Sequence, residues 1–208
     1  MSSLDFIDTL VQAKQIYVRQ QVEIGELFGY ETRNRYGIQT QAGREFCYCK
    51  EPQRGWQDSL ARLYLGHWRT FDLVATDNLS RPVFRIHHPW HWLLHRGQVF
   101  DQRDRYVGCI QQQFGWWNRK LVGFDANGTR IFSLRSPLWQ PWHFPLTQAG
   151  RPIALINKQW SGLAKEMFTD ADHFQIEFIA SSLNFDRKLL ILASALLIDL
   201  MYFERKAR

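Results

Sequence analysis

A stretch near the C-terminus reads Leu189-Leu-Ile-Leu-Ala-Ser-Ala-Leu-Leu-Ile-Asp-Leu-Met-Tyr-Phe203. Its fifteen residues favour a helix by their intrinsic propensities and are nearly all apolar, with one carboxylate at Asp199. A helix that is apolar on every side has to be buried, either in the middle of a folded domain or in a membrane. The place of this helix therefore decides the fold, and the two answers imply different functions.

The length of the stretch favours burial inside a domain. A membrane span needs about 20 apolar residues, whereas the run without charge, Leu189 to Ile198, has ten. Asp199 would add about 2.5–3.5 kcal/mol near the centre of a bilayer. Asp186 stands where an N-cap is expected, so the helix is predicted from Asp186 to Glu204, with a single-pass span as the alternative. Its expected core residues are Leu189, Leu192, Leu196, Asp199 and Phe203.

The middle of the chain repeats one pattern, in which an alternating run enters a turn and a second alternating run leaves it. Period-two runs on both sides of a Gly, Asn or Asp cluster predict β-hairpins. Four such hairpins pair residues 36–40 with 45–49, 70–74 with 82–86, 120–124 with 130–134, and 143–147 with 152–156. A sheet of this kind needs closed or covered edges, which favours a barrel or a sandwich whose strands wrap the helix.

The remaining segments predict smaller elements. Residues 4–13 have the pattern of an amphipathic helix, and residues 15–19 and 22–24 that of short strands. Residues 53–65 are the least strand-like part of the middle and predict a loop or a short helix. No Gly/Ser linker or charge run divides the chain, so residues 1–208 are expected to form a single domain.

The composition is that of a globular protein with a basic excess. Hydrophobic residues make up 45% and charged residues 22% of the 208 positions, the net charge is +6 and the pI is about 9.4. This excess indicates an anionic partner, either a nucleic acid or an acidic membrane face, or a basic surface kept for solubility. No recognition-helix or RNP-like motif supports binding to nucleic acid.

Cysteine usage and the N-terminus predict a cytoplasmic protein. Three cysteines, Cys47, Cys49 and Cys109, form an odd set that fits a reducing compartment better than a disulfide framework. Spacing of two places Cys47 and Cys49 on one face of a strand, as packing residues. The first ten residues carry two Asp and no basic cluster, so a secretory signal is not expected.

Histidines and tryptophans gather in the middle of the chain. The histidines are His87, His88, His91 and His95; Pro89 interrupts their helical spacing and no carboxylate or cysteine is near in sequence, so a metal site is not favoured. Tryptophan beside basic groups is typical of headgroup depth at a membrane, with packing in the protein as the alternative. The candidate lipid contacts are Trp90, Trp92, Trp116 and Trp117.

The residue types do not predict an enzyme. No nucleophile–base arrangement, phosphate-cradling Gly loop or pair of catalytic carboxylates is recognisable. Asp199 is expected to bond to polar groups of the strands around the helix, because a buried charge needs partners. The alternative is that it lines a path for lipids or ions.

Five motifs follow one another between residues 16 and 204. They read Gln20-Gln-Val-Glu-Ile24, Gly29-Tyr-Glu-Thr-Arg-Asn-Arg-Tyr36, Lys158-Gln-Trp-Ser-Gly-Leu163, Phe168-Thr-Asp-Ala-Asp-His-Phe-Gln-Ile-Glu-Phe178 and Leu197-Ile-Asp-Leu-Met-Tyr-Phe-Glu204. Together they resemble the phospholipid scramblase family of the tubby-like superfamily. The resemblance implies a closed twelve-stranded β-barrel around a central hydrophobic C-terminal helix. It also implies ATP-independent, calcium-stimulated movement of phospholipids between leaflets, at the cytoplasmic face of membranes.

The sequence departs from the animal members of that family at three places. Residues 87–95 replace their palmitoylated cysteine cluster, and only Lys158 remains of their basic nuclear-import segment. In the equivalent of their calcium loop, Asp170 and Asp172 hold positions one and three. Position six is Gln175 and position twelve is Ser181, where an EF-hand has Gly and Glu. The alternative is therefore a tight turn in which the Asp side chains accept hydrogen bonds from backbone N–H groups.

The expected function is phospholipid scrambling or lipid binding on an anionic leaflet, from a peripheral position at the inner face of the plasma membrane. The candidate metal is calcium, at Asp170 and Asp172. The alternative is a non-transporting tubby-like module that binds anionic lipids or a protein partner. A buried helix would leave the monomer without a span, so scrambling would need helix release, oligomers or distortion of the bilayer.

Overall fold

The computed structural model describes residues 3–21, 35–51, 71–89, 94–159 and 173–203. These residues form two helices, α1 (Ser3–Gln12) and α3 (Phe185–Tyr202), and twelve strands. The strands are β1 (Gln15–Gln21), β2 (Arg35–Thr40), β3 (Glu45–Lys50), β4 (Phe71–Thr76), β5 (Pro82–His88), β6 (Arg96–Asp101), β7 (Tyr106–Gln113), β8 (Asn118–Asp125), β9 (Arg130–Pro137), β10 (His143–Gln148), β11 (Arg151–Gln159) and β12 (His173–Phe178).

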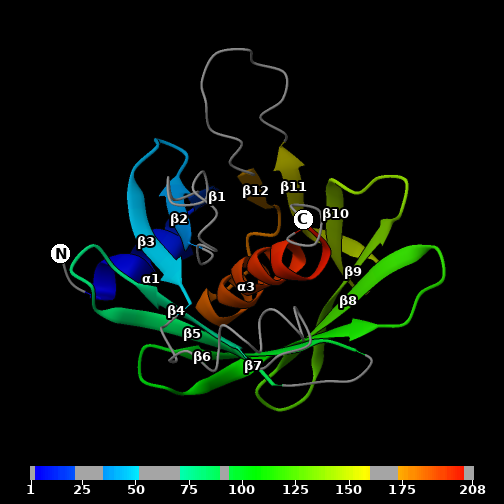
Figure 1. The fold of residues 1–208 in the computed structure, drawn as a ribbon, viewed down its shortest axis with the longest axis horizontal. Helices are drawn as coiled ribbons and strands as arrows, with labels where there is room; N and C mark the ends of the chain where they lie inside the picture. Colours follow the sequence, from blue (N-terminus) through cyan, green and yellow to red (C-terminus); the bar gives the residue numbers. More distant parts are fainter. Residues whose placement is uncertain (1–2, 22–34, 52–70, 90–93, 160–172, 204–208) are drawn as a thin grey trace, which may run out of the picture.

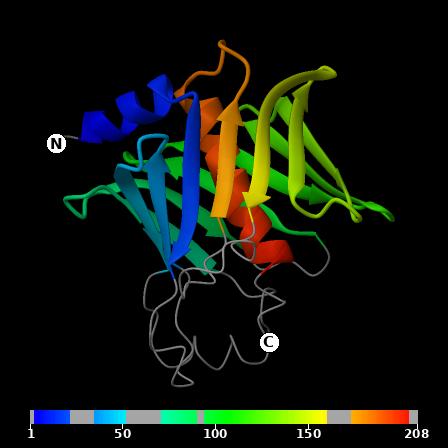
Figure 2. The same ribbon diagram turned by 90° about the horizontal axis from the view of Figure 1, so that it is seen from above.

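The strands close into a barrel around α3 (Figures 1 and 2). Each strand pairs with its neighbours along the chain, and the antiparallel pairing of β1 with β12 closes the sheet, with Ile16 opposite Ile176. A closed sheet leaves no unpaired edge, so the apolar faces of all strands can turn inward onto one helix. The predicted closed twelve-stranded barrel around a central C-terminal helix is confirmed.

All four predicted hairpins are present, as β2–β3, β4–β5, β8–β9 and β10–β11. The predictions for residues 4–13 and 15–19 correspond to α1 and β1, whereas those for 22–24 and 53–65 lie outside the described residues. The sequence pattern missed the hairpin β6–β7. One inward position of β6 is Gly97, where a Cβ would overlap the Leu197 side chain of α3, so the apolar alternation is interrupted.

Three hairpin turns share one five-residue geometry that begins with an aspartate. Asp77, Asp101 and Asp125 each accept, through Oδ1, the backbone N–H groups two and four residues later, at 2.8–3.0 Å. The fourth residue of each turn has a positive φ; these residues are Ser80, Asp104 and Gly128. An aspartate at the start of such a turn is the signal that would have identified the hairpin β6–β7.

Replacing Asp101 with Ala is expected to lower the free energy of unfolding by about 1–3 kcal/mol at pH 7, because the turn N–H groups lose their acceptor. Burial raises the pKa of Asp101, but hydrogen bonds from Arg103 and Arg105 outweigh burial and lower this pKa below its ordinary value. The carboxylate therefore stabilises the fold above the unfolded pKa of about 3.9, and this contribution is lost as the pH falls through the folded pKa.

Urea unfolding at pH 7 and at steps below pH 4 measures this effect. The stability difference between wild type and Asp101→Ala should shrink as the pH falls, and a difference that stays constant in acid would contradict the argument. Asp104→Asn is the matched control in the same turn, because Asn tolerates the positive φ of that position. It should change the free energy of unfolding by less than about 0.5 kcal/mol.

The start of α3 differs from the prediction. Asn184 is the N-cap, and its side chain accepts the backbone N–H of Arg187 at 3.1 Å. The N-cap prediction for Asp186 was therefore wrong, because Asn184 takes that role and Asp186 lies in the first turn. An acidic residue in the first turn still complements the helix dipole.

The body of α3 fills the barrel, as predicted. Every residue from Lys188 to Met201 is buried. The expected core residues Leu189, Leu192, Leu196, Asp199 and Phe203 are all buried. Within the part of the chain that the structure describes, neither helix has the length and apolar character needed to cross a membrane.

The three cysteines are free and buried, which confirms the predicted packing role of Cys47 and Cys49. Burial also raises the pKa of the Cys47 thiol well above its ordinary value, with its neighbour Cys49 adding to the effect. The thiol therefore stays protonated and behaves as a small apolar side chain.

Candidate functional site

The barrel end at which α3 begins is closed by α1. Phe6 of α1 packs edge-on against Phe185, with ring centroids 6.2 Å apart. Lys188, in the first turns of α3, donates through Nζ to the carbonyl oxygens of Val11 and Ala13 at 2.7 and 2.6 Å. Carbonyl groups at the end of a helix lack partners within that helix, so Lys188 satisfies the end of α1. Burial lowers the pKa of the Lys188 ammonium.

The same end is tied to the turn of hairpin β6–β7. Arg105 donates through Nε to Asp101 at 2.8 Å, and through its two terminal nitrogens to Asp186 at 2.8 and 3.1 Å. The Asp186 carboxylate, followed by that of Asp101, raises the pKa of Arg105. A bidentate pair of this kind fixes direction as well as distance, so it holds the first turn of α3 in place.

The opposite barrel end, where α3 finishes, contains a buried polar cluster. The hydroxyl of Tyr36 on β2 donates to Oδ2 of Asp199 at 2.9 Å. Lys158 Nζ on β11 lies 3.7 Å from Oδ1 of Asp199 and 3.4 Å from the ring centroid of Phe203. The side chains of Lys158 and Asp199 are each only 2% exposed. The expectation that Asp199 bonds to groups of the surrounding strands is confirmed.

Arg119 of β8 covers this cluster and ties it to a loop. Its guanidinium carbon lies 4.9 Å from the ring centroid of Tyr202 and 5.5 Å from that of Phe203. It also donates to the carbonyl oxygen of Pro141, in the loop between β9 and β10, at 3.4 Å. Burial lowers the pKa of Arg119 and raises the pKa of Tyr202 to about 12, so Tyr202 stays neutral at physiological pH.

Six large apolar side chains are exposed beside this end of the barrel. We call them the aromatic rim: Phe114, Trp116, Trp117, Leu138, Trp139 and Trp142. They come from the β7–β8 turn and the β9–β10 loop. The two segments are adjacent, because the backbone N–H of Leu138 donates to the carbonyl oxygen of Trp117 at 3.1 Å.

Sequence reasoning found only part of the aromatic rim. Trp116 and Trp117 are 79% and 72% exposed, so neither packs in the core, and packing at the rim of the barrel remains the alternative to lipid contact. The other four rim residues were not predicted, although two tryptophans on either side of Pro141, in a short connection between strands, are a signal of the same kind. The other predicted lipid contacts, Trp90 and Trp92, lie outside the described residues.

The histidines form two separate contacts. His87 Nδ1 lies 2.6 Å from the carboxylate of Asp72, which strand pairing places opposite it. The expectation that no carboxylate is near the histidines was therefore wrong. Asp72 is distant from the histidines in sequence, but the pairing of β4 with β5 places it opposite His87. His88 Nε2 and His95 Nδ1 are 2.9 Å apart, and His91 is outside the described residues. In the described ranges, no three His, Cys, Asp or Glu side chains are grouped as metal ligands.

The predicted calcium residues, Asp170 and Asp172, also lie outside the described residues. The positions that follow them form β12, in which Gln175 pairs with Asn157 of β11. A twelve-residue loop that began at Asp170 would include this strand. An EF-hand geometry therefore does not fit the chain, and only a shorter loop remains as a calcium site.

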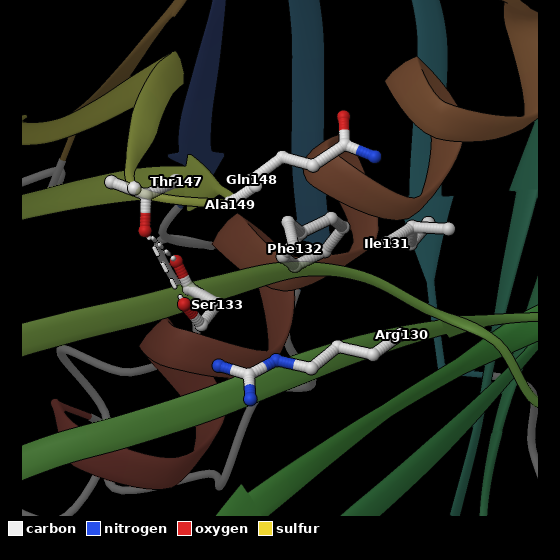
Figure 3. A pocket seen from close by; sticks show the side chains of 8 residues that line it. Arg130, Ile131, Phe132, Ser133, Thr147, Gln148 and Ala149 are labelled. Atoms are coloured by element: carbon white, nitrogen blue, oxygen red, sulfur yellow. Dashed lines mark hydrogen bonds between the residues drawn. The ribbon is translucent and has the colours of Figure 1, made fainter.

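A cleft of about 320 Å³ opens in the barrel wall between β9 and the β10–β11 turn (Figure 3). Two residue pairs join β9 to β10, and one of them is Ser133 with Thr147. The hydroxyl oxygens of these two side chains are 3.3 Å apart. Arg130 is the one charged residue that lines the cleft. The lining therefore contains no acid–base pair for catalysis.

Comparison with known proteins places this geometry in a family. The family profile described as Scramblase matches residues 2–205. Phospholipid scramblase 1 of Mus musculus is 30% identical over 217 residues, which cover 96% of this chain and 64% of the mouse protein. Phospholipid scramblase 2 of Bos taurus is 27% identical, covering 95% of this chain and 71% of the bovine protein. The chain thus spans just under two thirds of the mouse relative.

More distant proteins match over a similar range. Altered inheritance rate of mitochondria protein 25 of Saccharomyces cerevisiae is 24% identical over 240 residues, covering 96% of this chain and 73% of the yeast protein. An X-ray structure of an Arabidopsis thaliana protein has a TM-score of 0.50 at 15% identity, covering 97% of this chain and 98% of the plant chain. At that identity the likeness concerns the fold alone.

Proposed function

Because this chain belongs to the scramblase family, we propose that it binds phospholipids at the cytoplasmic face of a membrane and moves them between leaflets without ATP. The observation that carries the proposal is the exposed aromatic rim, in a chain that the Scramblase profile matches over residues 2–205. The hydrophobic helix serves as the core of the barrel, so lipid contacts come from the outer surface, where the aromatic rim is exposed. The inner face of the plasma membrane is the proposed location, and the proposed action is physical movement of lipids.

Enclosure of α3 also limits how lipids would move. Release of the helix would expose the apolar residues of α3 to water, at about 1.5–3 kcal/mol for each large side chain. The contacts of Lys188, Arg105 and Lys158 oppose such a release at both ends of α3. We therefore favour a mechanism in which the folded barrel perturbs the bilayer from its surface, so that headgroups cross where lipid packing is disturbed.

Reconstitution of the purified protein with a fluorescent phospholipid tests this proposal. The measurement is the fraction of label that a membrane-impermeant quencher reaches, compared with protein-free vesicles. Loss of fluorescence well beyond the outer-leaflet half is the expected result. Loss that stops at half, as in the protein-free control, would contradict phospholipid movement by this chain.

Calcium dependence is part of the same proposal and is measured in the same assay, with calcium or with a chelator. Asp170→Asn together with Asp172→Asn is the variant to compare. If the loop that contains these residues binds calcium, stimulation by calcium should disappear in the variant while the calcium-free rate stays unchanged. Stimulation of equal size in wild type and variant would place the calcium site elsewhere.

The second candidate function is a non-transporting module that binds anionic lipids or a protein partner. The enclosure of α3 and the ion pairs at both of its ends favour this candidate, because a rigid core gives lipids no route through the described part of the barrel. Vesicle binding without loss of fluorescence beyond half would establish it.

A further inference from the structure

We propose that the aromatic rim, with Lys120 and Arg135 beside it, docks the protein on an anionic phospholipid bilayer and turns the end of α3 toward that surface. The inference rests on the proposed function for the class of partner. The docking surface and its orientation come from the structure, and they hold whether or not lipids are moved between leaflets.

Apolar exposure on the described surface is concentrated at one place. Nine large hydrophobic side chains of the described residues are exposed, and six of them form the aromatic rim. Four of the six are tryptophans, whose rings combine a large apolar area with an N–H donor and favour the depth of lipid headgroups. Within the rim, Phe114 packs edge-on against Trp116 at a centroid distance of 5.4 Å, so these two rings present a formed surface.

Positive charge is concentrated in the same part of the barrel. Residues 106–159 contain six Lys or Arg and one Asp, a net charge of +5 in a chain whose net charge is +6. If the basic excess served only solubility, we would expect Lys and Arg to be spread over the whole surface and interspersed with acidic residues. Strands β7 to β10, which flank the aromatic rim, and their connections contain four of these bases and the one Asp, a net charge of +3.

Two of these bases lie next to the aromatic rim. Lys120 of β8 is directly opposite Arg135 of β9 in the sheet register. The side chain of Lys120 runs beside Gly115, with Cδ 3.5 Å from the place of a Cβ there. Among the described residues, neither base has an ion-pair partner. Like charges directly opposite each other destabilise a sheet, and an anionic surface would remove this cost.

The opposite end of the barrel carries charges of both signs. Arg105 pairs there with Asp101 and Asp186, and Arg85 pairs with Asp104. These ion pairs leave little net charge to attract an anionic leaflet. The aromatic rim therefore gives the bound protein one orientation, with α1 directed away from the membrane.

Flotation with vesicles tests the docking surface. The probes are vesicles of phosphatidylcholine alone and of phosphatidylcholine with phosphatidylserine, and the measurement is the fraction of protein that floats. Trp116→Ser together with Trp139→Ser should lower the partition constant at least about tenfold on both vesicles, because two interfacial anchors are lost. Leu79→Ser is the matched control, since Leu79 is 58% exposed on the β4–β5 turn at the other end; it should leave binding unchanged.

The two bases are tested separately. Lys120→Gln together with Arg135→Gln should lower binding to the anionic vesicles on the order of 30-fold, which corresponds to about 1 kcal/mol for each base near an anionic leaflet. Binding to phosphatidylcholine alone should stay the same. Thermal unfolding of each variant checks that the barrel is intact, which is the expected result because none of the substituted side chains is buried.

Each outcome decides between the two proposals. Vesicle binding by wild type that none of these variants weakens would overturn the docking surface and leave the proposed function standing. Binding that depends on the aromatic rim, without any lipid movement in the quenching assay, would overturn the proposed function alone. A wild-type protein that binds neither vesicle but forms a dimer sensitive to Trp116→Ser and Trp139→Ser would assign the surface to a second copy of this chain.

Discussion

Replacing Lys158 with Met, with Asp199 left in place, is expected to lower the free energy of unfolding by about 3–5 kcal/mol. The carboxylate of Asp199 is buried, and Lys158 is the cation that faces it, 3.7 Å away. Removal of the cation leaves the buried carboxylate, which accepts a hydrogen bond from the hydroxyl of Tyr36, without its ion pair to Lys158. Urea unfolding at neutral pH, followed by far-UV circular dichroism, measures the loss.

The control for this prediction removes both charges. Lys158→Met together with Asp199→Leu should recover most of the lost stability, because a buried ion pair replaced by apolar groups of similar volume is often neutral or stabilising. A double variant as unstable as Lys158→Met alone would show that the loss comes from packing around Phe203. Tyr36→Phe alone should cost about 1–3 kcal/mol, since it removes one hydrogen bond to the buried carboxylate.

Replacing Leu192 with Ala is expected to lower the free energy of unfolding by about 2–5 kcal/mol. Leu192 is fully buried in the middle of α3, where strands surround the helix on all sides. The barrel wall is a closed hydrogen-bonded sheet, so it cannot collapse easily into the space that the smaller side chain leaves. Urea unfolding of the purified variant in detergent-free buffer measures the effect.

Leu79→Ala is the matched control for Leu192→Ala, because the same side chain is removed from an exposed turn. It should change the free energy of unfolding by less than about 0.5 kcal/mol. An equally small effect of Leu192→Ala would contradict the enclosure of α3 in the folded protein. It would then favour a helix that is accessible to lipids.

The hairpins show how far local sequence patterns reach. Alternation around Gly and Asn predicted four of them, because in each case the inward residues are large and apolar. The hairpin β6–β7 was missed because β6 has Gly97 where the Leu197 side chain of α3 packs against it, and a glycine gives no hydrophobic signal. The requirement for a glycine at that position comes from Leu197, a residue one hundred positions away in the chain.

The candidate site shows the same limit. The sequence indicated Trp116 and Trp117 as candidate lipid contacts. That they lie beside Trp139 and Trp142 depends on the contact of the β7–β8 turn with the β9–β10 loop. The pairing of Lys120 with Arg135 depends on the register of β8 and β9, and the Asp72–His87 contact on that of β4 and β5. Register sets side-chain neighbours across a sheet, and no local pattern contains it.

The sequence by itself determined that an apolar helix must be buried and that hairpins must surround it, because hydrophobic periodicity and turn chemistry act over a few residues. It also determined that Asp199 needs polar partners, since a carboxylate among apolar residues costs free energy without them. Only the tertiary structure decided that those partners include Tyr36 and Lys158, and that tryptophans from two separate loops form one exposed surface beside Lys120 and Arg135. These contacts join residues far apart in the chain, and closure of the barrel is what brings them within reach.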